Sequence, residues 1–172
     1  MHRMSQGYLR RRRAAGYALL EALVAVIVAA VGFIGAARMQ TFGMVLSNSA
    51  QSRQKAVLLA YQMTDRIRAN REAFTKGHYS NPGSGGPVAC LAAASGCTST
   101  ELAGADVTQW LAEVAAQLPA GQGKLCLDST PDDDPKPTPA DWKCDGLGNV
   151  LAVKVAWTDN RAATTFVTVV RP

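Results

Sequence analysis

An acidic residue, Glu21, lies inside an apolar segment that extends from residue 17 to residue 37. At about 1.5 Å per residue, a helix over this segment is roughly 31 Å long, which matches the hydrocarbon thickness of a bilayer. Lipid solvates a carboxylate poorly, so an ionisable group in such a segment indicates a function beyond anchoring. The alternative is that Glu21 only reaches back to the lipid headgroups.

Four consecutive arginines at positions 10–13 precede this segment. Positive charge beside a membrane-spanning helix favours the cytoplasmic side. The arrangement therefore predicts that residues 1–16 face the cytoplasm and that the chain after Arg38 lies on the opposite side of the membrane.

The residues around Gly16 resemble a known processing site. A short basic leader, Gly16, the aromatic Tyr17, three uncharged residues and Glu21 in an apolar helix are similar to the site found in type IV prepilins. In that family a membrane peptidase cuts after the glycine and methylates the new N-terminus. The resemblance implies that residues 1–16 are removed and that Glu21 is the fifth mature residue. Tyr17 replaces the usual Phe of the family, and Ala18 replaces a common Thr.

Once such a leader is removed, Glu21 has a natural partner in a neighbouring copy. The new amine of Tyr17 is a cation at the membrane surface, and the carboxylate lies one helical turn deeper. Two opposite charges in a low dielectric are far more stable together than apart. Glu21 is therefore predicted to set the register between stacked subunit helices.

Four cysteines follow the membrane segment: Cys90, Cys97, Cys126 and Cys144. The predicted topology places them outside the cytoplasm, where disulfides persist. Four cysteines permit three connectivities, of which we favour Cys90 with Cys97 and Cys126 with Cys144. Free thiols or a metal site are the alternative, although the spacings are not those of a zinc site.

The sequence offers no catalytic constellation. His78 is the only histidine outside the leader, so the sequence supports neither a metal triad nor a Ser-His-Asp relay. Asp128, Asp132, Asp133 and Asp134 could surround calcium, but without EF-hand spacing a solvated acidic loop is the simpler interpretation. We therefore expect no enzyme activity, no metal and no cofactor.

The positive net charge of the whole chain comes from its leader. The sequence has 18 basic and 13 acidic side chains, and five of the arginines lie in residues 1–16, which contain no acid. The remaining chain is therefore neutral, which argues against nucleic-acid binding.

Helical character is predicted to continue from the membrane segment to residue 74, because no proline interrupts it. The helix is predicted to stop at Lys76 and Gly77, since glycine can take the left-handed conformation that ends helices. Residues 38–76 form this amphipathic continuation. The apolar residues at helical spacing, expected to face the core, are Leu46, Ala50, Val57, Tyr61, Thr64 and Ile67.

The end of this helix carries a second resemblance. The run Asp-Arg-Ile-Arg-Ala-Asn at 65–70, followed by Gly-His-Tyr at 77–79, is similar to the PilV group of type IV minor pilins. In that group a D-R-x-R-A-N segment closes the long helix before a G-x-Y turn. The alternative for Arg66, Arg68 and Arg71 is a solvated helix face, since helix C-termini attract cations.

Residues 77–172 are predicted to form one small head domain. A second helix is expected to be capped by Asp106, to place Trp110 in the core, and to end at Pro119 before a turn at 121–123. Strands are expected at 124–128, 150–157 and 164–170, the last two forming a hairpin around 159–161. The stretch from 129 to 148 is rich in Pro and Asp and predicts a long excursion.

These elements predict an α+β protein with the type IV pilin fold, in which a long N-terminal helix packs on a small antiparallel sheet. Its parts are the leader, 1–16; the transmembrane part of the helix, 17–37; the amphipathic part, 38–76; and a disulfide-stapled head, 77–172.

The resemblance implies a structural minor pilin that takes part in pilus initiation and assembly, and thereby in adhesion and twitching motility. Its partners would be major and minor pilins, through the N-terminal helix, prepilin peptidase, the inner-membrane assembly machinery and a tip adhesin. It would reside in the inner membrane before assembly and in the pilus afterwards.

Two alternatives stay open. A minor pseudopilin of a type II secretion system shares the leader, the helix and the fifth-position Glu, and genomic neighbours would distinguish the two. A periplasmic protein with an ordinary signal peptide would be cut after Ala37, where Gly35 and Ala37 supply small residues. The length of the apolar segment and the presence of Glu21 argue against the signal peptide.

Overall fold

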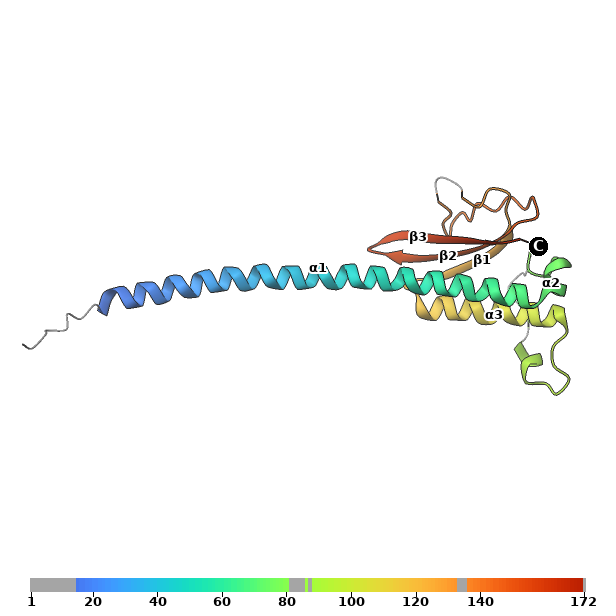
Figure 1. The fold of residues 1–172 in the computed structure, drawn as a ribbon, viewed down its shortest axis with the longest axis horizontal. Helices are drawn as coiled ribbons and strands as arrows, with labels where there is room; N and C mark the ends of the chain where they lie inside the picture. Colours follow the sequence, from blue (N-terminus) through green and yellow to red (C-terminus); the bar gives the residue numbers. More distant parts are fainter. Residues whose placement is uncertain (1–14, 81–85, 87, 133–135, 172) are drawn as a thin grey trace, which may run out of the picture. The chain divides into compact units, whose positions relative to one another are not determined.

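The computed structural model describes residues 15–80, 86, 88–132 and 136–171 of the 172-residue chain. The arginines at 10–13 and the aspartates at 133 and 134 therefore lie outside the described residues. The chain divides into two units, residues 1–46 and residues 47–172 (Figure 1).

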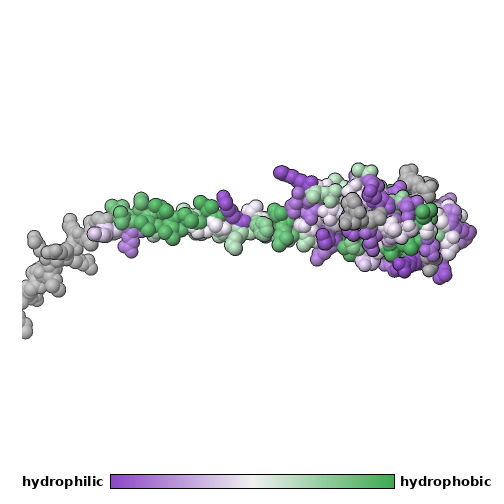
Figure 2. Space-filling model, turned by 90° about the horizontal axis from the view of Figure 1, so that it is seen from above, coloured by the Kyte–Doolittle hydropathy of each residue, from purple (hydrophilic) through white to green (hydrophobic). Residues whose placement is uncertain are grey.

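Helix α1, Ala15–Ala69, begins in the first unit and ends in the second. Every side chain from residue 17 to residue 48 is exposed. The 53 residues Tyr17–Ala69 contain a window of mean hydropathy 2.5, and within the described part of the chain this is the one helix long and apolar enough to cross a membrane. Figure 2 shows hydrophobic residues along the helix of the first unit. The predicted membrane-length helix is thus present.

The face that α1 buries differs in part from the expected one. Thr64 and Ile67 are buried as predicted. Leu46 is 63% exposed, Tyr61 is 50% exposed and Ala50 is also exposed, so these three predictions were wrong. The side chains of α1 that are buried are Ala56, Leu59, Ala60, Met63, Thr64 and Ile67. Apolar residues at helical spacing occur on two faces of this part of the helix, and the sheet and α3 cover only one of them.

The helix stops earlier than expected. At Asn70 the backbone leaves helical geometry, with φ −99° and ψ 60°, and a short helix, α2 (Arg71–Thr75), follows. The Asn70 side chain accepts a hydrogen bond from the amide of Ala73 at 3.4 Å and so caps α2. Gly77 has a φ of 77° and closes this segment, as the sequence predicted.

Helix α3, Ser99–Gln117, begins seven residues before the predicted cap. Thr98 accepts from the amide of Glu101, and the Glu101 carboxylate accepts from the amide of Thr98, which together form a capping box. The expectation that Asp106 caps the helix was therefore wrong. A 3-10 helix, η1 (Val88–Ala92), precedes α3.

Trp110 of α3 is fully buried, as predicted, and its indole nitrogen donates to the carbonyl of Leu59 in α1 at 3.0 Å. Space for its ring depends on Gly123. A Cβ at Gly123 would lie 2.5 Å from the ring, a separation that real Cβ atoms do not show. The turn expected at 121–123 lies at 118–121 instead, where the amide of Gly121 donates to the carbonyl of Leu118 at 3.0 Å, and Gln122 already belongs to a strand.

The sheet is antiparallel with the order β1-β2-β3 (Figure 1). Its strands are β1, Gln122–Leu127; β2, Leu151–Asp159; and β3, Ala162–Val170. The predicted hairpin between β2 and β3 is confirmed. Its turn residues, Asn160 and Arg161, have φ of 47° and 71°, the type I′ geometry that suits the twist of paired strands. Together with α1 the sheet confirms the α+β fold.

Candidate functional site

The residues singled out for processing and registry lie at the start of α1. The backbone of Gly16 is helical, and Tyr17 and Glu21 lie on α1 four residues apart. The Tyr17 side chain is 80% exposed and that of Glu21 is also exposed. Residues four apart share a helix face, so both side chains are open to a neighbouring helix on the same side of α1.

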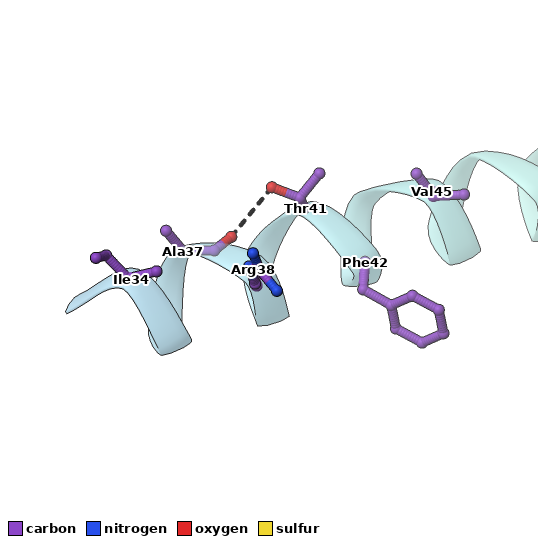
Figure 3. A pocket seen from close by; sticks show the side chains of 6 residues that line it. All are labelled: Ile34, Ala37, Arg38, Thr41, Phe42 and Val45. Carbon is purple, nitrogen blue, oxygen red and sulfur yellow. Dashed lines mark hydrogen bonds between the residues drawn. The ribbon is translucent and has the colours of Figure 1, made fainter. Parts of the chain in front are cut away.

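Farther along the first unit, one face of α1 forms a shallow apolar surface (Figure 3). It is lined by Ile34, Ala37, Arg38, Thr41, Phe42 and Val45. The hydroxyl of Thr41 donates to the carbonyl of Ala37 at 3.0 Å, so this polar group is satisfied within its own helix. The face therefore presents apolar side chains and a single charge, that of Arg38.

In the second unit the Asp-Arg-Ile-Arg-Ala-Asn run and the Gly-His-Tyr turn meet in a buried polar cluster. Asn70 donates to the carbonyl of Ser99 at 2.7 Å and to the hydroxyl of Tyr79 at 3.3 Å. The Tyr79 hydroxyl donates to the Asp106 carboxylate at 2.7 Å. We call Asn70, Tyr79 and Asp106 the junction cluster, because it joins the α1–α2 break, the turn and α3.

Arg66 reinforces this junction. Its guanidinium donates to both carboxylate oxygens of Glu113, at 2.9 and 3.2 Å, and to the carbonyl of Asp106 at 3.4 Å. Both side chains of the ion pair are about two-thirds covered. A solvated helix face is thus the wrong interpretation for Arg66, whereas Arg68 and Arg71 are exposed and fit it.

Burial raises the pKa of Tyr79, and the bond that it donates to Asp106 raises it further. The phenol therefore stays protonated and remains a donor. This agrees with a structural role for the cluster: its hydroxyl links Asn70 to Asp106 rather than acting as a base.

We expect Tyr79→Phe to destabilise the head by about 1 to 3 kcal/mol, because Asp106 and Asn70 then lose a buried partner. Denaturant titration of the full chain in detergent, followed by tryptophan fluorescence, measures the change. Tyr61→Phe is the matched control, since Tyr61 is half exposed and should change the stability little. Equal stability of the two variants would contradict the role of the cluster.

A second buried polar site, which was not predicted, lies on the face of the sheet opposite to the one that packs on α1 and α3. The ammonium of Lys154 on β2 is fully buried and bonds the carboxylate of Asp128, which is also fully buried. It further donates to the carbonyls of Trp142 at 2.7 Å and Lys143 at 3.3 Å. All three donors of the ammonium therefore have acceptors.

This pair holds the excursion at 129–148 against the sheet. Pro137 adds a second attachment, because its carbonyl accepts from the Thr165 hydroxyl on β3 at 2.6 Å. Gly146 adds a third, because its amide donates to the carbonyl of Leu127 at the end of β1 at 3.1 Å. Within the excursion, the Asp145 carboxylate accepts from the hydroxyl and the amide of Ser129, and these bonds lower its pKa. The described part of the excursion is thus a fixed surface.

Asp128, one of the four aspartates considered as calcium ligands, instead forms a buried ion pair with Lys154. Asp132 is exposed, and Asp133 and Asp134 lie outside the described residues. Among the residues that the structure describes, no three His, Cys, Asp or Glu side chains are grouped so as to hold a metal ion.

The structure contains the two disulfides that the sequence favoured. Cys90 and Cys97 are joined with their Cα atoms 4.9 Å apart, and Cys126 and Cys144 with theirs 6.1 Å apart. The first staples the segment before α3, and the second ties the end of the excursion to β1. Closing such loops stabilises a small domain mainly by restricting its unfolded state.

Taken together, these features make the architecture pilin-like: a long apolar N-terminal helix packed on a small antiparallel sheet, with disulfides. No protein-family model, curated protein or solved structure matches the chain.

Proposed function

We propose that the chain is a structural subunit of a type IV pilus, a minor pilin that takes part in initiating and assembling the fibre. The observation that carries the proposal is α1 itself. Its first part, residues 17–48, is exposed along its length, whereas residues 56–67 supply core side chains of the head. An exposed helix of this length and hydropathy suits a membrane before assembly and a bundle of similar helices after it.

In this proposal the subunit is anchored in the inner membrane with its head in the periplasm. Prepilin peptidase removes residues 1–16, and other pilins then pack against α1. The disulfides agree with a head outside the cytoplasm, because they persist in oxidising compartments. Glu21 pairs with the Tyr17 amine of a neighbour and sets the register.

The test is Glu21→Ala. Insertion into the membrane should persist, because removing a charge makes the segment more apolar. Assembly should fall, since the amine of the neighbouring Tyr17 loses its carboxylate. Even half of the about 3 to 5 kcal/mol associated with a broken buried pair lowers incorporation by at least about tenfold. Quantitative immunoblots of sheared fibres and of membrane fractions report the two results separately.

Two further variants sharpen this test. Glu21→Gln should be nearly as defective as Glu21→Ala if charge pairing is the cause, because the amide carries no charge. Thr41→Ala is the control: it removes a polar group from the same exposed helix, but one that is already satisfied within α1. Wild-type amounts of Glu21→Ala in fibres would refute the registry role.

A further inference from the structure

Three arginines gather around one hollow in the head. Arg68 near the end of α1, Arg71 at the start of α2 and Arg171 directly after β3 line it, together with Phe74 and Thr75. Its volume is about 150 Å³. Figure 1 shows the end of β3 and α2 at the same end of the head, which is how residues a hundred positions apart come together.

The positive charge of this hollow is poorly compensated. The guanidinium of Arg68 lies 3.6 Å from the carboxylate of Asp65, but this ion pair is exposed, and water therefore weakens the attraction between its two charges. Within the described residues, neither Arg71 nor Arg171 forms an ion pair. The nearest acid along α2, Glu72, is bound to Lys76 at 2.6 Å, and this bond lowers its pKa. Since residues 17–172 carry equal numbers of acids and bases, this gathering of guanidinium groups is local rather than a consequence of net charge.

The chemistry of the lining selects an oxyanion. A guanidinium presents planar, paired donors that match phosphate oxygens, and several such groups favour a doubly charged anion over a singly charged one. Phe74 is partly buried against the core and supplies an apolar wall, which strengthens the attraction by excluding water from one side. The small volume limits the occupant to a single phosphate-sized group.

We propose that this hollow, the arginine pocket of Arg68, Arg71 and Arg171, binds one phosphate-class oxyanion. Free phosphate and the phosphate of a lipid headgroup share this chemistry. The proposal goes beyond a role in the fibre and does not depend on it, because the pocket lies wholly in the head.

The experiment is a calorimetric titration of the full chain, in an uncharged detergent and at low ionic strength, with inorganic phosphate. We expect binding with a dissociation constant of about 1 mM or tighter, weakening as salt is added. Arg71→Gln and Arg171→Gln should each weaken binding by about tenfold or more. Arg161→Gln is the matched control: it removes the same charge from the exposed hairpin turn and should leave the binding unchanged.

A second titration distinguishes the two sources. A short-chain phosphatidic acid, used below its micelle concentration, binds about tenfold more tightly than inorganic phosphate if the ligand is a headgroup, and equally if it is free phosphate. Either result supports the pocket when the arginine variants weaken it. Absence of binding by both probes overturns the proposal. So does binding that survives Arg71→Gln and Arg171→Gln, or that falls equally in Arg161→Gln.

Discussion

Replacing Asp128 by alanine should lower the free energy of unfolding of the head by about 3 to 5 kcal/mol. The substitution leaves the ammonium of Lys154 fully buried without its carboxylate, and an uncompensated buried charge is among the most destabilising changes known. The two carbonyls that also accept from Lys154 do not replace a negative charge. Denaturant unfolding of the full chain in detergent, without reductant, measures the loss.

Two variants test the cause. Asp132→Ala removes an exposed acid from the same excursion and should change the stability by less than about 0.5 kcal/mol. The double variant Asp128→Leu with Lys154→Met removes both charges and should recover most of the loss, because apolar replacements of a buried ion pair are often neutral. A double variant as unstable as Asp128→Ala would show that the shape of the site matters rather than its charge.

Replacing Trp110 by alanine should cost a similar amount, about 3 to 5 kcal/mol. Its ring fills the space between α3, α1 and β1, and its indole donates to the carbonyl of Leu59. Trp142→Ala is the matched control, because Trp142 is partly exposed in the excursion. Thermal unfolding followed by far-ultraviolet circular dichroism measures both, and similar melting temperatures for the two variants would contradict the assignment of Trp110 to the core.

The contact with Gly123 offers a more specific check of this packing. Gly123→Ala places a methyl group where the Trp110 ring lies, so it should be destabilising on its own. When Trp110 is already alanine, the same methyl enters the cavity and should cost much less. Additive effects of the two substitutions would show that these residues do not touch.

Local patterns predicted the elements of the fold well. The β2–β3 hairpin followed from two alternating runs separated by Asn160 and Arg161, and its turn has the geometry that asparagine tolerates. The start of α3 was mispredicted although a local signal was present: Thr98 and Glu101 have the spacing of a capping box. This error could have been avoided from the sequence alone.

The remaining errors concern contacts between distant parts of the chain. Asn70 breaks the long helix because its side chain reaches Tyr79 and the carbonyl of Ser99, and no local pattern contains those partners. Lys154 alternates with apolar residues as an outward-facing side chain should, yet it is buried because the excursion folds over it. The alternation of apolar and polar residues predicts which face of the strand a side chain lies on, but it does not predict whether a distant segment of the chain packs over that face.

The central claim, that the chain is processed and assembled as a pilin, is tested most directly by the N-terminus of the exported protein. Intact-mass and peptide mass spectrometry of the chain from sheared fibres should find Tyr17 as the first residue, carrying a methyl group. An N-terminus at Arg38 would instead identify residues 1–37 as a signal peptide. In that case Glu21 would be absent from the mature protein, and the proposed role of α1 in the fibre would be contradicted.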